Sequence, residues 1–308
     1  VFSWALDRDL FAFRAKQVFQ LDRHAISEIL VERLDSAPRT LHLTAGDPLW
    51  TVESDGRKLT ADPYVIDKFL LLLTRDLKAD AFVTDHYTAE DAVKYGLDKP
   101  TFAITVHSAG GRVDKAFVGV GARPAGTGEP DEAGKAAPFV HIEGASSVAV
   151  TYNALLSDLS KGLPEFRDKR VTDFDLEAVR RIEILREGTP PLVLDGMGDS
   201  WQLISPESAP ARVDRAKAIA MQFSKLRAVR VIDEEKSPAK LAELGLEPPE
   251  LRVLLRADGG RMLADIRFGR PIDKDTVAVT AEGVTRIDAV KDASLRLLPM
   301  TPDEIIRR

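Results

Sequence analysis

The feature that most constrains this chain is a long internal repeat: two stretches share one order of sequence patterns, about 150 residues apart. The tryptophan in GDPLWTVESDG corresponds to the tryptophan in GDSWQLISPE, and each follows a short apolar stretch typical of a half-buried strand. This period is far longer than that of solenoid repeats. The chain of 308 residues is therefore expected to contain two similar domains.

The segments after each tryptophan predict one order of elements in both copies. YVIDKFLLLLTRDLKADAFV and VDRAKAIAMQFSKLRAVRVI have the apolar spacing of a helix. Thr88 and Ser237 then stand as N-caps of a short helix, with Asp91 three residues after the first and Pro238 directly after the second. Four strand patterns follow. The predicted fold class is α+β, with two tandem copies of a module: β-hairpin, helix, short helix, antiparallel meander and helix.

The joints between copies set the expected domain boundaries. Residues 1–30 are a lead-in segment that resembles the end of a preceding module, because Phe13 and Arg14 match Phe166 and Arg167. This segment is either the remnant of an upstream module or the standard lead-in to each unit. The first module is expected at residues 31–170 and the second at residues 171–308.

The copies differ most in one loop. The stretch from Gly121 to Gly144 is nine residues longer than the stretch from Gly269 to Gly283, since 23 minus 14 is 9. Its Gly/Pro/Ala-rich composition predicts a mobile surface loop over residues 122–138. The loop is either an ornament or a place of interaction that only the first copy has.

Composition excludes several classes of protein. The formal charge of −6 is spread over mixed-sign stretches without a basic stripe, so no nucleic-acid partner is expected. No apolar run reaches the roughly 20 residues of a membrane span, and the densest is FLLLL at residues 69–73. The chain has no cysteine, which leaves the compartment open. It begins at Val1, and an upstream segment is expected to be missing from it.

Titratable residues show no pattern of catalysis or metal binding. The five histidines are scattered, without the H-E-x-x-H spacing that places two on one helix face. His86, beside Asp85 and Tyr87, is the best candidate, against the simpler interpretation of a solvated loop residue. The other strand histidines, His42, His107 and His141, are expected on sheet surfaces. The motifs HSAGGR and RADGGR favour hairpin turns over phosphate loops. No cofactor and no metal is expected.

A Gly-Leu-acid-Pro element occurs once in each copy, as KYGLDKP and ELGLEPP. It is either a binding loop or structural punctuation. Punctuation is favoured because the glycine can end a helix in a left-handed conformation, the leucine can pack beside it and the proline can start a strand. The residues are Gly96, Leu97 and Pro100 in the first copy, and Gly245, Leu246 and Pro249 in the second.

The joint segment FRDKRV holds the candidate interaction residues Arg167, Lys169 and Arg170. These cations could recognise an anionic partner. They could equally cap the carbonyl groups of a preceding helix while Phe166 anchors the segment in a core. The recurrence of Phe13, Arg14 and Lys16 at the other joint favours the structural interpretation.

Taken together, the tryptophan hairpin, YGLDKP, the strand ends VGVGA and IRFGR, and FRDKRV resemble the bacterial DUF4340 family, a domain of unknown function. The second copy departs from the pattern with LGLEPP. The resemblance implies a membrane-anchored protein with an extracytoplasmic body, often encoded beside ABC-2-type transporter subunits that include those of gliding-motility type. It implies no catalytic residue.

Three functions remain open. The first is a non-catalytic binding or assembly module outside the cytoplasm, with a protein partner in a membrane complex and a membrane anchor that lies outside this chain. The second is a hydrolase or glycan-active enzyme with a site at the module junction. The third is a polymer-binding module that uses exposed aromatic residues, Tyr87, Tyr95 and Tyr152. A periplasmic location is expected, with the cytoplasm as the alternative.

Overall fold

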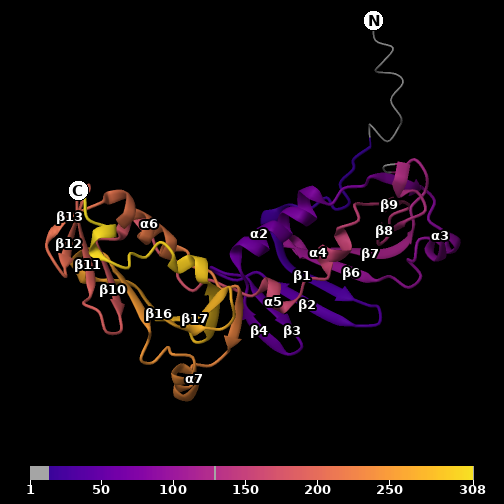
Figure 1. Ribbon diagram of the computed structural model, residues 1–308. Coiled ribbons are helices and arrows are strands. Elements are labelled where there is room, and N and C mark those ends of the chain that lie inside the picture. The colour runs from indigo at the N-terminus through magenta and orange to yellow at the C-terminus, as the bar shows by residue number, and fades with distance from the viewer. Residues whose placement is uncertain (1–13, 128–129, 308) are drawn as a thin grey trace, which may run out of the picture. The chain divides into compact units, whose positions relative to one another are not determined.

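The computed structural model describes residues 14–127 and 130–307, which fold into two compact units. The first unit ends at Asp168 and the second begins at Lys169. Each unit contains one nine-stranded antiparallel sheet accompanied by short helices (Figure 1). This mixed content agrees with the predicted α+β class at the level of secondary structure.

The first unit carries four helices among its described residues. Its strands are β1 (Ile26–Arg33), β2 (Arg39–Thr44), β3 (Thr51–Ser54), β4 (Arg57–Thr60), β5 (Ala81–Thr84), β6 (Phe102–Ser108), β7 (Arg112–Ala122), β8 (Ala136–Ile142) and β9 (Val148–Val150). Its helices are α2 (Pro63–Leu71), α3 (Ala89–Lys94), α4 (Leu155–Leu159) and α5 (Leu163–Phe166).

The second unit has two α-helices in the part of the chain that the structure describes. Its strands are β10 (Arg181–Arg186), β11 (Leu192–Met197), β12 (Ser200–Ser205), β13 (Ala209–Ala211), β14 (Arg230–Asp233), β15 (Leu251–Arg256), β16 (Met262–Pro271), β17 (Thr276–Ala281) and β18 (Ile287–Lys291). Its helices are α6 (Val213–Ser224) and α7 (Pro238–Glu243).

The two sheets have the same strand order. The first runs β4-β3-β2-β1-β6-β7-β8-β9-β5, and the second runs β13-β12-β11-β10-β15-β16-β17-β18-β14. Each unit therefore opens with four antiparallel strands, where the sequence predicts a single hairpin. In this opening part of the first unit, the prediction misses two strands, β1 and β4. Strand β1 crosses residues 30 and 31, where the lead-in was expected to end.

Two apolar clusters fix the layers of the first unit. Helices α2, α4 and α5 pack on one face of the sheet through the main core, which includes Phe69, Val140 and Phe166. The turn after α3 packs on the other face through a smaller cluster that includes Tyr95 and Phe139. Because successive strand residues point to opposite faces, Phe139 and Val140 serve one cluster each. This end of the sheet is covered on both sides.

Helix α2 begins as its sequence dictates and ends in an unusual turn. The side chain of Asp62 accepts a hydrogen bond from the backbone N–H of Tyr64, and Pro63 occupies the first turn. The helix then widens into a π-helical turn over residues Leu72–Asp76. Such a turn accommodates one extra residue within a helix.

The predicted caps of the short helices are confirmed. Thr88 and Asp91 form a reciprocal capping box at the start of α3. Ser237 accepts a hydrogen bond from the backbone N–H of Lys240 at the start of α7. Local sequence therefore decides where both helices begin.

The ends of the units differ from the predicted closing helix. In the first unit the closing stretch forms α4 and α5, whereas in the second unit it forms 3-10 turns at Asp292–Leu295 and Pro302–Glu304. In both units a residue near the end of the unit forms an isolated β-bridge to a residue just before the main helix. Arg167 pairs with Ala61 before α2, and Ile306 pairs with Ala211 before α6. Phe166 and Ile305, each next to a bridge, are buried. Among the described residues, no helix is both long enough and apolar enough to cross a membrane.

Candidate functional site

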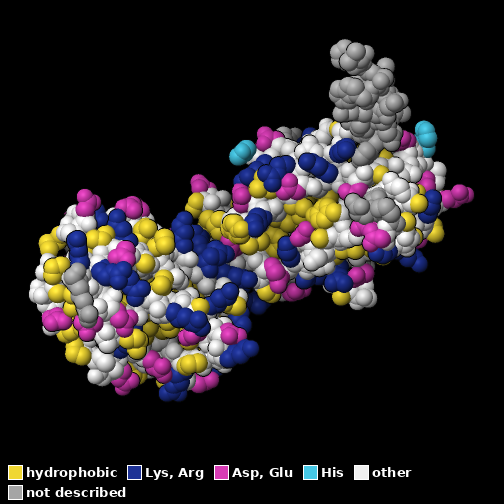
Figure 2. All heavy atoms as spheres, turned by 45° about the horizontal axis from the view of Figure 1, so that its top comes forward, with side chains coloured by type: hydrophobic (Ala, Val, Ile, Leu, Met, Phe, Trp, Pro, Cys, Tyr) yellow, Lys and Arg dark blue, Asp and Glu magenta, His cyan; other side chains and the backbone are white. Residues whose placement is uncertain are grey.

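The surface of α2 offers the clearest candidate site, because apolar side chains continue from the core onto the exposed side of this helix. At 100° per residue, Leu71, Tyr64, Leu72 and Val65 occupy one arc beside the buried arc of Phe69, with Lys68 between Tyr64 and Leu72. We call these four residues the α2 face. Tyr64 is 59% exposed, and the Lys68 ammonium lies 4.4 Å from the centre of its ring. Figure 2 shows hydrophobic side chains gathered in a band on the first unit.

The corresponding helix of the second unit is polar at most of these positions. The backbone N–H of Asp62 bonds the carbonyl of Phe166, and that of Arg212 bonds the carbonyl of Ile305, so the two helices start at corresponding points. Counting from there gives the matched pairs Tyr64 and Asp214, Val65 and Arg215, Leu71 and Met221, and Leu72 and Gln222. Of these four residues in the second unit, Met221 alone is apolar. The α2 face is thus a property of the first unit alone.

The FRDKRV segment is built into both units by backbone pairing. Asp168 donates its backbone N–H to the carbonyl of Thr60, and Val171 donates its own to the carbonyl of Leu226. Phe166 is 1% exposed and meets Phe69 edge to face at 5.2 Å. These contacts give the segment a structural duty in each unit.

The predicted cations of that segment divide between the two units. Arg170 forms an ion pair of 2.7 Å with Asp173, and its carbonyl accepts a hydrogen bond from Arg286. Arg167 belongs to the first unit, whereas Lys169 and Arg170 belong to the second. Within the second unit, these contacts hold Arg170, and the carbonyl of Lys169 accepts a hydrogen bond from the backbone N–H of Ala228.

The histidines lie apart in the fold. His86 is exposed in the loop before α3. His42 lies on β2, with its Nε2 atom 2.5 Å from Oε1 of Glu28. His141 is expected on a sheet surface but is 7% exposed, because the ring of Tyr87 stacks on it at 3.9 Å. Across residues 14–127 and 130–307, no three His, Asp or Glu side chains are grouped to hold a metal ion.

Of the three aromatic residues proposed for polymer binding, Tyr95 is buried and Tyr87 and Tyr152 are half-buried, which corrects the expectation that they are exposed. Tyr95 is 2% exposed and stacks on Phe139 at 4.6 Å. Burial, followed by the charges of Asp91 and Asp98, raises the pKa of the Tyr87 phenol. Both side chains belong to the cluster beneath α3.

Tyr152, the third of the proposed aromatic residues, is also engaged. Its hydroxyl donates to Oδ2 of Asp158 at 3.1 Å, and its ring packs against the main core. Among these three tyrosines, the fold therefore leaves no exposed ring platform on which a polymer could stack.

The Gly-Leu-acid-Pro element ends a helix in both units. Gly96 and Gly245 have φ angles of +66° and +67°, in the left-handed region. Leu97 donates its backbone N–H to the carbonyl of Ala92, five residues earlier, and Leu246 does the same to Leu241. This is the Schellman arrangement, and both leucines are buried.

Pro100 and Pro249 come just before strands β6 and β15, respectively. Gly119 of β7 lies so close to Gly96 that a Cβ atom on it would stand 2.5 Å from the Gly96 carbonyl oxygen. Gly269 has the same relation to Gly245, so Gly119 and not Gly121 is the counterpart of Gly269. The sequence comparison, which matched Gly121 with Gly269, is therefore wrong by two residues at the start of the long loop.

A buried arginine holds the described parts of that loop. The Arg123 side chain is 2% exposed, and its Nη1 donates to Asp80 at 3.1 Å and to the Thr127 carbonyl at 2.8 Å. Its Nη2 donates to the Thr151 carbonyl at 2.6 Å, and Glu132 lies 3.7 Å from its Nε. The sequence predicts a mobile loop, whereas these contacts anchor it on both sides of residues 128–129.

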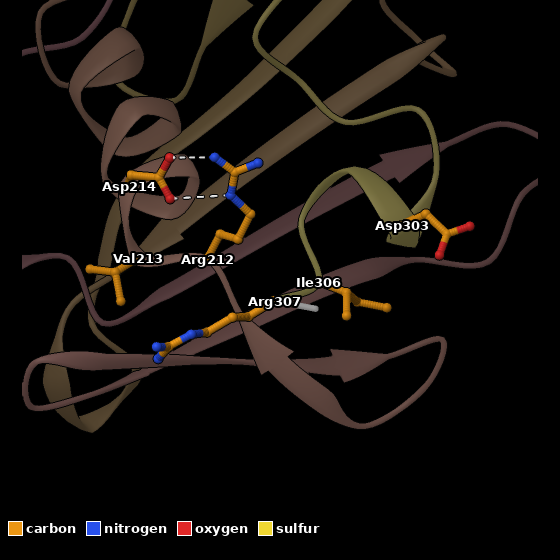
Figure 3. A pocket seen from close by; sticks show the side chains of 6 residues that line it. All are labelled: Arg212, Val213, Asp214, Asp303, Ile306 and Arg307. Atoms are coloured by element: carbon orange, nitrogen blue, oxygen red, sulfur yellow. Dashed lines mark hydrogen bonds and ion pairs between the residues drawn. The ribbon is translucent and has the colours of Figure 1, made fainter.

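An open pocket of about 630 Å³ lies at the start of α6. It is lined by Arg212, Val213, Asp214, Asp303, Ile306 and Arg307 (Figure 3). Arg212 makes two hydrogen bonds to Asp214, of 3.3 Å and 2.7 Å, which hold the pKa of that carboxyl below its ordinary value. Asp303 and Arg307 lie on opposite sides of the view and point apart. The pocket thus brings no acid and base together on a common centre.

The face of the second sheet opposite its main helix carries a network of ion pairs. Arg181 contacts Asp195 at 2.8 Å and Glu183 at 3.0 Å, and Arg256 contacts Glu183 at 3.1 Å. Arg181 pairs in register with Asp195 on one side and with Arg256 on the other, and Glu183 contacts both arginines. Such a face neutralises itself and is typical of a solvated sheet surface.

Sequence reasoning missed the α2 face, although a signal was present. The run FLLLL places apolar residues on more of the helix surface than the side that is buried in the core. A comparison of the two helix stretches position by position would have shown more apolar residues in the first copy than one buried stripe requires.

The comparisons with known proteins identify a family and no individual relative. A model of the DUF4340 family, described as a domain of unknown function, matches residues 2–100, 75–238 and 201–308. No curated protein and no solved structure matches the chain. Because the three overlapping matches extend over nearly its whole length, the chain belongs to the DUF4340 family.

Proposed function

We propose that this protein is a non-catalytic binding and assembly module, and that the α2 face is where it docks on a protein partner. The observation that carries the proposal is the difference between corresponding helices. Where α6 is polar or charged, α2 has the exposed Tyr64 and the half-buried Val65 and Leu72, which also pack against the main core. A helix that is apolar beyond its buried stripe needs a second covering surface.

The nature of the α2 face suits a protein partner. Tyr64 offers a large ring with a polar tip, and aromatic residues of this kind are enriched in protein interfaces. Lys68, whose ammonium lies over that ring, stands within the face, and Asp67, which is paired with Arg23, supplies a charge at the margin. An apolar centre with a polar rim is the usual anatomy of an interface.

The proposal extends to the setting of the protein and to its origin. We infer an extracytoplasmic, membrane-anchored auxiliary subunit of an ABC-type transport or gliding-motility-related complex; support comes from the family resemblance. We further infer that the units are duplicated copies of one α+β module. Their matching strand orders and their matching closing bridges support this.

Co-purification tests the docking proposal. The native, membrane-extracted protein is compared with a Tyr64→Asp variant, which introduces the residue found at the matched position of α6. A Met221→Gln variant is the control, because it removes a side chain that is 62% exposed on α6. A partner protein should remain with wild type and with the control and be lost from Tyr64→Asp. Equal recovery from all three would refute the α2 face as the docking site.

A further inference from the structure

A second feature separates the units: a pocket in the first unit lies where the second unit is filled. The pocket has a volume of about 380 Å³ and is bounded by the segment after Arg14 and by strands β5, β8 and β9. Its floor is apolar and includes Phe82, Val140 and Ala149. It shares no lining residue with the α2 face.

Strand pairing identifies the corresponding place in the second unit. Ala149 pairs with Phe82 and with Val140 in the first sheet, as Asp288 pairs with Val231 and with Val279 in the second. Asp288 is therefore the counterpart of Ala149. Arg286, two residues earlier, is the counterpart of Ser147.

In the second unit these two residues fill the space with an ion pair. Asp288 is fully buried and accepts a hydrogen bond of 2.9 Å from Nε of Arg286. Nη2 of Arg286 donates to the carbonyl of Arg170 at 3.2 Å. Small side chains stand at both positions in the first unit, so this ion pair is missing there and a pocket is left. Arg14 covers part of its floor, because its guanidinium lies 3.6 Å from the centre of the Phe82 ring.

The Arg170 carbonyl, which accepts from the Arg286 guanidinium, has a counterpart in the first unit. Arg170 bridges Arg227, and Gln17 bridges Lys78 through the same backbone pattern. The carbonyl of Gln17 is therefore the counterpart of the Arg170 carbonyl. Gln17 lines the pocket, and so does Asp114, a carboxylate whose side chain is 18% exposed. Strand pairing gives Ala264 as the counterpart of Asp114 in the second sheet.

From this arrangement we propose that the pocket binds a guanidinium group, supplied by an arginine side chain of a partner protein. The Gln17 carbonyl accepts its N–H groups. The Asp114 carboxylate, which already accepts hydrogen bonds of 2.7 Å and 2.8 Å from Arg112, shares its remaining lone pairs with the guanidinium, and the apolar floor covers its aliphatic stem. An anion is disfavoured, because both arginines of the pocket already face carboxylates: Arg14 pairs with Asp85, and Arg112 pairs with Asp114.

The proposal goes beyond the docking function and is tested apart from it. The isotope-labelled full chain is titrated with N-acetylarginine methylamide while backbone amide shifts are recorded by NMR. Saturable shifts are expected at Ser147 and Ala149, with a dissociation constant on the order of 1 mM for a single side chain. N-acetylnorleucine methylamide, which has the stem without the charge, should cause no saturable shifts, and inorganic phosphate should cause none.

Two variants make the test specific. The double change Ser147→Arg with Ala149→Asp copies the filled pocket of the second unit and should abolish the shifts. Asp114→Asn should weaken binding several-fold. This single change serves as the test if the double variant does not fold. The proposal is overturned if the arginine probe causes no saturable shifts, if norleucine or phosphate binds equally well, or if Asp114→Asn binds as wild type does.

Discussion

At the scale of single residues, two glycines allow the turn after α3 to lie directly on β7. A Cβ atom on Gly96 would stand 2.5 Å from the carbonyl oxygen of Val120, and one on Gly119 would stand 2.4 Å from that of Tyr95. Both neighbours are backbone atoms, which cannot rotate away. Gly96 also has a positive φ, so it meets two separate demands for glycine.

Replacing Gly96 with alanine is therefore expected to destabilise the protein more than a positive φ alone explains. Gly110 is the matched control, because its φ is +78° and a Cβ atom there would meet nothing within 4 Å. Gly110→Ala should cost about 1 kcal/mol of unfolding free energy, and Gly96→Ala about 3 kcal/mol. Urea unfolding measures both. Equal losses would show that the contact with β7 does not constrain Gly96.

Tyr152 should make the first unit sensitive to alkali. Burial, followed by the charge of Asp158 and the hydrogen bond to it, raises the pKa of this phenol above its ordinary value of 10.0. The folded state thus holds the proton more tightly than the unfolded state. Its contribution to stability is complete below about pH 10 and is lost as the pH rises above that value.

A Tyr152→Phe variant isolates this effect. Near pH 8 it should be less stable than wild type by about 1 kcal/mol, because the hydrogen bond to Asp158 is lost. Above pH 10 wild type should lose stability faster than the variant, so the gap between them should shrink. Thermal melts at several pH values measure the gap, and a constant gap up to pH 11 would contradict the account.

Single residues also show what sequence could and could not reveal. The duty of Gly96 was readable, because a glycine after a capped helix and before a leucine has a local reason to be there. The burial of His141 was not readable. It depends on Tyr87, 54 residues earlier in the chain (141 minus 87), which reaches it only once the fold has formed.

At the scale of elements, the long loop of the first unit depends on Arg123. Its guanidinium bonds two backbone carbonyls and faces Asp80 and Glu132 from a nearly fully buried position. Removing one partner of such a buried network leaves the other groups without compensation. The loop and the end of β9 should loosen together when this side chain is lost.

An Arg123→Ala variant should therefore lose about 3 to 5 kcal/mol of unfolding free energy. Arg75→Ala is the control, since Arg75 pairs with Asp76 but is 62% exposed, and it should lose less than about 1 kcal/mol. Hydrogen exchange should show faster exchange at residues 123–127 and 132–135 in Arg123→Ala alone. Unchanged exchange there would mean that other contacts hold the loop.

Whole elements were predicted where their signals are local and missed where they are not. The helices α3 and α7 follow from their caps. The sequence places part of strand β1 in a lead-in segment. Its pairing with β2 and β6, which marks it as a strand of the sheet, is seen only in the folded structure. The π-helical turn of α2 explains why apolar positions shift by one residue between the two helix patterns.

At the scale of the whole molecule, each unit carries its own core. The main cluster of the first unit and that of the second contain no common residue and lie on either side of the division at Asp168 and Lys169. A unit with its own core and its own sheet is expected to fold alone.

Fragments 1–168 and 169–308 should each unfold in a single cooperative transition. Far-UV circular dichroism during heating measures this for each fragment. A fragment that shows no cooperative transition, while the full chain does, would mean that its stability depends on the other unit.

The two units differ where function is proposed. Their strand orders agree, yet the first unit has an apolar α2 face and an open pocket where the second has polar residues and a buried ion pair. The mixed helix and strand content could be inferred from the sequence. These differences could not, because a pocket is visible only when strand pairing shows which residues share one place.

Site-specific photo-crosslinking in native membranes tests the docking claim most directly. A photoreactive amino acid replaces Tyr64 in one version of the protein and Met221 in another, since both side chains are exposed, at 59% and 62%. The account predicts a discrete crosslink to another protein from position 64 and none from position 221. Crosslinks of equal yield from both positions, or no protein crosslink from position 64, would contradict it.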